Sequence, residues 1–215
     1  MIAATSHTAL ERSLDRLVVF VNSVAKVASW VCGFLLTLSA LIICIDIGLR
    51  STLVITLGGA NEIAGYTLAI ASSWGCSVAL VYRMHIRIDS LYTHLSHRLR
   101  AALDILGLVA LIYFMALVTL YAYGVVAQSI ISNSHSISEL ETPLALPQAI
   151  WFAGFVVFLF SAGVYLARAI VAFAHGDLNK VSELLGARSV EEEIEAEKDS
   201  LGTARPADAT AGGTP

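Results

Sequence analysis

Charged side chains are scarce in this chain: Asp, Glu, Lys and Arg make up 14% of its 215 residues, against about 25% in an ordinary soluble domain. Apolar residues make up 57%, which exceeds the usual share of about 45–50%. A soluble domain of this size could not bury so much apolar surface, since a small protein has a large surface for its volume. The composition therefore excludes an ordinary soluble protein and indicates one whose solvent is lipid.

The residues that carry most catalytic and metal chemistry are few and scattered. Cys32, Cys44 and Cys76 fall inside apolar runs and form no C-x-x-C pair, which argues against a zinc site or a redox relay. No G-x-S-x-G, H-E-x-x-H or phosphate-binding Gly-rich motif occurs in the sequence. The sequence therefore predicts that the chain is not an enzyme and that it holds no cofactor and no metal ion.

The six His residues lie outside the middles of the apolar runs, in predicted loops, at span edges or in the N-terminal segment. Haem between transmembrane helices needs facing imidazoles, so buried haem is not expected. The basic residues lie within a turn or two of the apolar runs, with no nucleic-acid-binding fold around them, and we expect no nucleic-acid partner. The polar N-terminus lacks the apolar core and cleavage site of a removed signal peptide.

Long apolar runs are what the sequence does contain. A bilayer core about 30 Å thick requires about 20 apolar residues in a helix. The charge-free runs that meet this need are Val27–Ile45, Ile63–Tyr82, Ile105–Ala127 and Ala149–Ala167. The sequence therefore predicts an all-α integral membrane protein with four transmembrane helices, over residues 17–49, 61–83, 103–127 and 148–173.

Lys and Arg are distributed unevenly among the segments that flank these runs. They gather in the N-terminal flank, in the connection between the second and third spans, and in the C-terminal flank, whereas the first loop has only Arg50 and the third has none. Because positively charged loops stay in the cytoplasm, we expect both termini and the middle connection to be cytoplasmic. The expected organisation is a cytoplasmic N-terminal segment (1–16), a four-helix membrane domain (17–173) and a cytoplasmic, acidic, partly disordered tail (174–215).

The connection between the second and third spans has helical periodicity as well as positive charge. The apolar residues that recur at helical spacing are Ile88, Leu91, Leu95 and Leu99. Arg and His residues stand largely at the other positions. This pattern favours an amphipathic helix over about 88–100 that lies at the membrane interface against lipid headgroups. The alternative is an irregular loop that serves only as a topology signal. A second short amphipathic helix is expected after the last span, using Leu178, Val181, Leu184 and Leu185.

Ionisable residues occur at the ends of the spans. Asp46 and Arg50 are four residues apart and can pair on one helix face. Glu62 opens the second span, where a helix N-terminus favours a carboxylate. Two interpretations remain open: these charges are satisfied within the chain, or they form a polar contact with another protein at the outer face.

Small residues recur every four positions along the second span, at Gly65, Ala69, Ser73 and Ser77. Small residues at this spacing let helices approach closely in lipid, where dispersion and weak polar contacts drive association. The stripe fits packing inside the chain's own four-helix bundle, and it equally fits packing against a partner.

The chain resembles the small membrane subunit of tripartite ATP-independent periplasmic (TRAP) transporters, the DctQ-like family, from about Asp46 to Arg168. The stretches that carry the resemblance are "DIGLR" at the end of the first span, Glu62 after it, "RMHIRID" after the second span, and "TPLALP" before the fourth. Within "RMHIRID", His85, Ile86, Arg87 and Asp89 match the family's H-I-x-V-D pattern, with Ile88 in place of Val. The sequence departs from the family at Met84, where Gly is common, and in "GGANE", which lacks the usual aromatic residue.

The resemblance implies a multi-pass protein of the bacterial inner membrane that pairs with a large multispan permease subunit. In such transporters a periplasmic solute-binding protein delivers an organic acid, and a sodium gradient drives its uptake. The large subunit carries the substrate and ion sites, so the resemblance implies a non-catalytic small subunit that braces it. Asp46, Arg50 and Glu62 would then lie at the periplasmic end, and Arg83, His85, Arg87 and Asp89 at the cytoplasmic end, near membrane lipids.

Two other functions stay open at this point. A self-sufficient, homo-oligomeric small transporter or channel would need an essential acidic residue facing a cavity, and Glu62 is the fair candidate. A membrane anchor subunit of a redox complex is the other alternative, although it lacks His ligands inside the spans.

Overall fold

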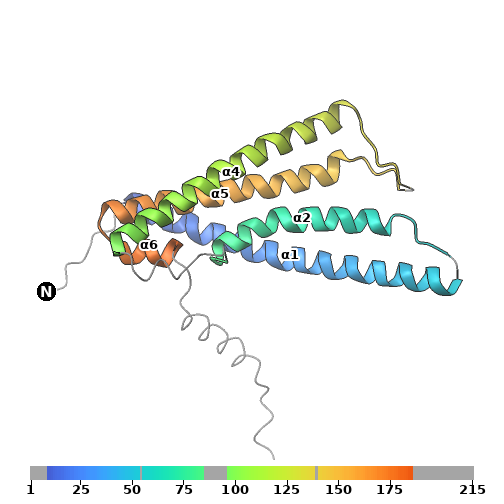
Figure 1. The fold of residues 1–215 in the computed structure, drawn as a ribbon, viewed down its shortest axis with the longest axis horizontal. Helices are drawn as coiled ribbons and strands as arrows, with labels where there is room; N and C mark the ends of the chain where they lie inside the picture. The colour runs from blue at the N-terminus through green and yellow to red at the C-terminus, as the bar shows by residue number, and fades with distance from the viewer. Residues whose placement is uncertain (1–8, 54, 85–95, 139, 186–215) are drawn as a thin grey trace, which may run out of the picture.

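The computed structural model describes residues 9–53, 55–84, 96–138 and 140–185. Within them the chain is helical, with an isolated bridge between His135 and Pro143 as its only β-type pairing. The helices are α1 (Ala9–Leu53), α2 (Ala60–Val81), α4 (His97–Ile131), α5 (Ala145–Ala174) and α6 (Leu178–Leu185) (Figure 1). The expected all-α class is confirmed for the described residues.

Four of these helices are long and apolar enough to cross a membrane, as the sequence predicted: α1, α2, α4 and α5. At about 1.5 Å per residue, the 45 residues of α1 extend roughly 68 Å, more than twice the thickness of a bilayer core. Its charge-free part, Val27–Ile45, extends only about 28 Å. The helix therefore continues well beyond the part that hydropathy marks.

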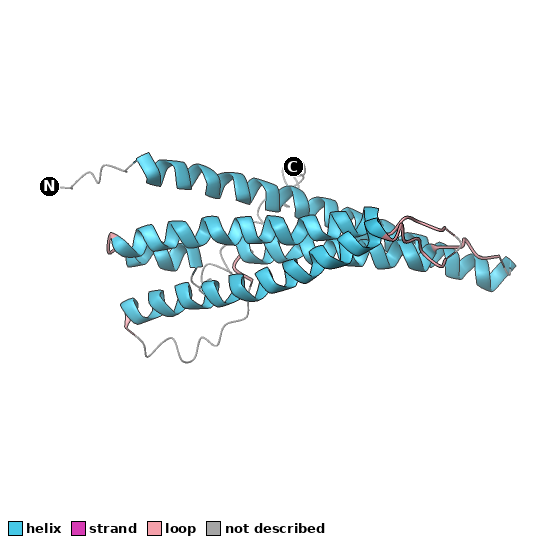
Figure 2. Ribbon diagram, turned by 90° about the horizontal axis from the view of Figure 1, so that it is seen from above, coloured by secondary structure: helices cyan, strands magenta, loops and turns pink. Residues whose placement is uncertain are grey.

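The four long helices run along one axis and alternate in direction (Figure 1, Figure 2). α5 lies at the centre, because it packs against α1, α2 and α4 and also contacts α6. One end of the bundle holds the loops between α1 and α2 and between α4 and α5, and we call it the Glu62 end. The opposite end holds the C-terminus of α5, and we call it the Arg168 end.

The core of the bundle is small and surrounds α5. Phe158, Ala162 and Ala169 of α5 are almost completely buried. Phe158 and Ala162 belong to one cluster with Val21 of α1 and Leu108 of α4. The outer surface is apolar as well, since Trp30 on α1 and Tyr121 on α4 are among many exposed large hydrophobic side chains. A soluble bundle would cover such side chains, whereas a membrane bundle presents them to lipid or to a partner helix.

Two helices begin earlier than the sequence predicted. α1 begins at Ala9 instead of near residue 17, and α4 begins at His97 instead of near 103. The reason is that hydropathy marks the lipid-embedded part of a helix, while charged residues continue the same helix into water. The last residues of the predicted interfacial helix, 97–100, are thus the first turn of α4. The rest of it, 88–95, lies outside the described residues and stays a prediction.

The short amphipathic helix expected after the last span is confirmed as α6. Its Val181 is fully buried in a cluster with Ala101 of α4 and Ala172 of α5. Helical packing therefore continues past residue 173, where the sequence set the end of the membrane domain. The tail after Leu185 lies outside the described residues.

Candidate functional site

At the Glu62 end, the Asp46 carboxylate joins the last turns of α1 to the loop before α2. Asp46 is 6% exposed, and a buried carboxylate is costly unless hydrogen bonds satisfy it. Its Oδ2 accepts a hydrogen bond from Arg50 Nη2 at 3.2 Å, and its Oδ1 accepts one from the backbone N–H of Leu57 at 2.7 Å. The carboxylate is thus engaged by its own chain, both on the helix and in the loop.

Glu62 lies in the first turn of α2 and faces the loop between α4 and α5. The Tyr66 hydroxyl, one turn along α2, donates a hydrogen bond to Glu62 Oε1. Ser136 and Thr142 of the α4–α5 loop approach the same two side chains. Glu62 Oε2 is buried and has no hydrogen-bond partner among the described residues. We call Glu62, Tyr66, Ser136 and Thr142 the Glu62 cluster.

The two loops at this end contact each other directly. The α4–α5 loop is held by backbone hydrogen bonds from Ser136 N to Thr142 O at 2.9 Å and from Leu144 N to Ser134 O at 3.0 Å. The Leu140 side chain of this loop covers Gly59, at φ +80° just before α2, where any Cβ would overlap it. The left-handed backbone at position 59 favours glycine, because any other residue would be strained there.

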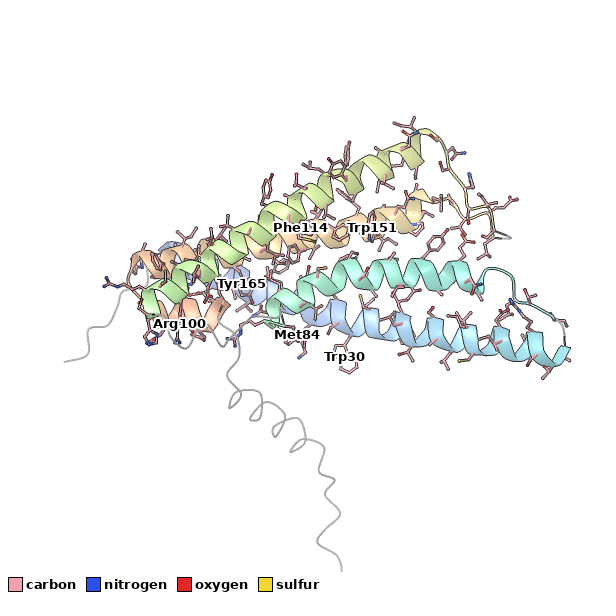
Figure 3. All side chains as sticks on the ribbon, viewed as in Figure 1. Trp30, Met84, Arg100, Phe114, Trp151 and Tyr165 are labelled. Atoms are coloured by element: carbon pink, nitrogen blue, oxygen red, sulfur yellow. The ribbon has the colours of Figure 1, made fainter. Side chains whose placement is uncertain are left out.

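At the Arg168 end, polar side chains hold the N-terminal half of α1 against α5. Arg168 is only 3% exposed, and its Nε donates a hydrogen bond to Asp15 Oδ1 at 2.7 Å. One turn earlier on α5, the Tyr165 hydroxyl donates to Asn22 Oδ1 at 2.7 Å; Figure 3 shows Tyr165 in the interior of the bundle. A buried guanidinium without a partner would be strongly destabilising, so Asp15 stabilises the position of Arg168.

The remaining candidates at this end are only partly described. Arg83 is the second residue after α2 and has a left-handed backbone conformation, with φ 55°. His85, Arg87 and Asp89 lie outside the described residues. Whether Arg83, His85, Arg87 and Asp89 act together as a functional segment therefore stays a prediction.

The small residues of α2 divide into an inner and an outer set. Ser73 and Ser77 are buried, and α5 approaches Ser73 so closely that a Cβ on Gly154 would lie 2.5 Å from Ser73 Oγ. Beside this crossing, Trp74 Nε1 donates a hydrogen bond to the carbonyl oxygen of Ile150 at 3.0 Å. Gly65, near the start of the same helix, has open space around it. The crossing of α2 and α5 thus uses the inner part of the stripe for packing inside the chain.

Sequence reasoning missed most partners of these polar groups. The Glu62–Tyr66 bond could have been found, because the two residues are four apart on a helix. The Arg168–Asp15 pair joins residues 153 positions apart, and Ser136 and Thr142 reach α2 only through the fold. Within the described residues, no group of three or more His, Cys, Asp or Glu side chains could hold a metal ion.

The chemistry available at both ends is charge pairing and hydrogen bonding between helices and loops. A family model described as tripartite ATP-independent periplasmic transporters, DctQ component, matches residues 39–173, which is more than half of the chain. The match begins in α1, before Asp46, and ends at the last turn of α5. No curated protein and no solved structure matched the chain.

Proposed function

The chain belongs to the family of DctQ components of tripartite ATP-independent periplasmic transporters, and on that premise we propose that it is the non-catalytic small permease subunit that braces the large permease subunit in the bacterial inner membrane. The transporter imports an organic acid that a periplasmic solute-binding protein delivers, and a sodium gradient drives the uptake. In this proposal the small subunit contributes helical surface to the large one, and no substrate or ion site of its own.

The observation that carries the bracing role is the way the chain pairs two of its buried charged residues, Asp46 and Arg168; the third among the described residues, Asp104 of α4, is 4% exposed. Asp46 binds Arg50 and the loop that leads to α2, and Arg168 binds Asp15. Both charged groups lie toward an end of a long helix and are engaged by the chain itself. Ionisable groups that conduct ions or protons are expected inside the membrane, where they face a cavity. The arrangement favours a rigid helical support over a permeation path.

The proposed orientation follows from the positive-inside rule. Both termini and the Arg168 end face the cytoplasm, and the Glu62 end faces the periplasm. The Glu62 cluster and the α4–α5 loop then lie on the side where the binding protein delivers its solute, and Arg83–Asp89 lies on the cytoplasmic side. A cysteine introduced at Ile137, which is fully exposed in the α4–α5 loop, should react with a membrane-impermeant maleimide in intact spheroplasts. Lack of labelling there, with labelling after lysis, would reverse the assigned orientation.

The bracing role is tested by comparing the chain alone with the complete system. Deletion of its gene should abolish growth on the transported organic acid, and a plasmid copy of the gene should restore it. The purified chain alone in proteoliposomes should transport nothing under a sodium gradient, even with the binding protein and solute present. Solute uptake by the chain alone would contradict the proposal and favour the self-sufficient transporter, for which Glu62→Gln would then be the first variant to examine.

A further inference from the structure

An open cleft lined by both polar and apolar side chains lies between α1 and α2 on the Arg168 side of the bundle. It has a volume of about 370 Å³. Its lining consists of Val19, Asn22, Ser23 and Lys26 from α1 and of Val81 and Tyr82 from the end of α2. None of these side chains has a role in the helix-to-helix pairing described above, except that Asn22 accepts the hydrogen bond from Tyr165.

The position of this cleft across the bilayer follows from the two helices that form it. On α1, 19 residues without charge, Val27–Ile45, separate Lys26 from Asp46. On α2, 19 residues without charge, Ile63–Val81, separate Glu62 from Tyr82. Each run extends about 28 Å, close to the ~30 Å of the bilayer core. Because α1 and α2 pack against each other in opposite directions, we expect Lys26 and Tyr82 to lie at the same boundary of the hydrocarbon, next to the headgroup region.

The cleft presents hydrogen-bond donors and one positive charge. Lys26 is exposed, and its ammonium group forms no ion pair with a carboxylate among the described residues. The Oδ1 of Asn22 is occupied by the Tyr165 hydroxyl, so the side-chain NH2 is the group that Asn22 has left to offer. The Ser23 hydroxyl donates to the backbone oxygen of Val19. An ammonium group and an amide NH2 are both donors that suit an anion.

An apolar strip continues from the cleft toward the middle of the membrane. Val27, Trp30, Val31 and Phe34 are all exposed on α1. Trp30, one turn beyond Lys26, is 75% exposed and points away from the bundle (Figure 3). Tryptophan is enriched at the membrane interface, where its ring lies at the level of the headgroups. A ligand that uses both features has an anionic head and an apolar tail.

We propose that this cleft binds a membrane phospholipid, with Lys26 and Asn22 contacting the phosphate and the exposed strip from Val27 to Phe34 contacting an acyl chain. Basic pockets between transmembrane helices are suited to phospholipid headgroups. A free phosphate ion would use the donors but leave the strip unused. The site depends on the chain spanning the bilayer and not on its role as a transporter subunit.

Lipid binding can be measured on the full-length protein extracted in mild detergent, with any subunit that co-purifies. Native mass spectrometry would count bound phosphatidylglycerol during a titration, with diacylglycerol of the same chains and inorganic phosphate as separate arms. Lys26→Gln removes the charge-assisted contact to the phosphate and should weaken phosphatidylglycerol binding by about tenfold. Arg12→Gln makes the same change of charge at an exposed position of α1 outside the cleft and should leave binding unchanged.

Each arm has a result that overturns the proposal. Equal binding by Lys26→Gln and the unaltered protein would show that Lys26 does not contact the bound lipid. An equal loss of binding in Arg12→Gln would show that α1 attracts lipid only through its general charge. Diacylglycerol that binds as tightly as phosphatidylglycerol would exclude recognition of the phosphate. Inorganic phosphate that displaces the lipid at millimolar concentration would identify a site for free anions instead.

Two further measurements keep the proposal falsifiable if Lys26→Gln fails to fold. Asn22→Asp keeps an oxygen for Tyr165 but replaces the amide donor by a carboxylate, so it should also weaken phosphatidylglycerol binding. In the unaltered protein, phosphatidylglycerol should protect Lys26 from a lysine-acylating reagent, while Lys180 on α6 should react equally with and without the lipid. Acylation of Lys26 that the lipid does not slow would contradict the proposed contact.

Discussion

The close crossing of α2 and α5 makes Gly154 a sensitive position of the bundle. A methyl group added there would lie 2.5 Å from Ser73 Oγ, 2.8 Å from Trp74 Cδ1 and 2.9 Å from the backbone nitrogen of Trp74. Ordinary contacts between such atoms are about 3.5–4.0 Å, so α2 would have to move outward by roughly 0.6 Å or more. The variant Gly154→Ala should therefore separate the two helices at their point of closest approach.

The size of the effect follows from two losses. Overpacking costs about 1–3 kcal/mol, and moving α2 weakens the hydrogen bond from Trp74 to Ile150, which is worth up to about 1.5 kcal/mol. Gly163→Ala is the matched control, because Gly163 lies on the same helix with open space around it. Replacing Gly by Ala stabilises a helix by about 1 kcal/mol through its higher helix propensity. This gain is the same in both variants, so it cancels when their stabilities are compared. We expect Gly154→Ala to be less stable than Gly163→Ala by about 1–4 kcal/mol.

The assay is reversible unfolding in mixed micelles, in which increasing dodecyl sulfate unfolds the helical bundle and the loss of tertiary structure is followed by tryptophan fluorescence. Gly154→Ala should unfold at a lower dodecyl sulfate fraction than Gly163→Ala, and Gly163→Ala at the same fraction as the unaltered protein or a higher one. If the two variants unfold together, the close approach of α5 to α2 is not a feature of the folded protein in its membrane-like environment, and the reasoning is refuted.

Three more substitutions test other contacts with the same unfolding assay or with proteolysis. Asp15→Asn leaves the buried Arg168 guanidinium without its carboxylate and should cost about 1–3 kcal/mol, and unchanged stability would show that the pair contributes nothing. Asp46→Asn removes the charge that binds Arg50 and weakens the hydrogen bond to the loop before α2. An added protease should therefore cleave this loop faster than in the unaltered protein. Equal cleavage rates would contradict the account. Val181→Asp places a charge in the fully buried contact of α6 with α4 and α5. We expect α6 to detach, so that trypsin cleaves the chain near Lys180. Protection of α6 from trypsin would contradict the assigned packing.

The sequence was sufficient for the parts of the fold that depend on hydropathy and length. Each span carries an uninterrupted apolar run, and a bilayer permits few structures other than helices for such a run. The starts of α1 and α4 could not be found in this way, because Glu11 and His97 continue a helix outside the lipid, where hydropathy is uninformative. α6 was predictable because its apolar residues recur at helical spacing over a single short segment.

The polar contacts were predictable only where they are local. The pair of Asp46 and Arg50 follows from their spacing on one helix. The bond from Leu57 to Asp46 and the pair of Arg168 with Asp15 depend on which helices become neighbours. Four helices of similar length and composition can be arranged in several ways, and local spacing does not choose among them. The small residues of α2 show the same limit, because only the fold separates buried Ser73 from open Gly65.

The central claim, that the chain is the small subunit that braces a large permease, is tested most directly by the composition of the complex in the native membrane. A tagged chain expressed from its own locus would be extracted in mild detergent and purified, and the mass of the intact complex would be measured. The account predicts that the chain purifies together with a large multispan permease subunit, without absorbance in the haem Soret region. A homo-oligomer of the chain alone, or a complex with a haem-containing redox enzyme, would contradict it.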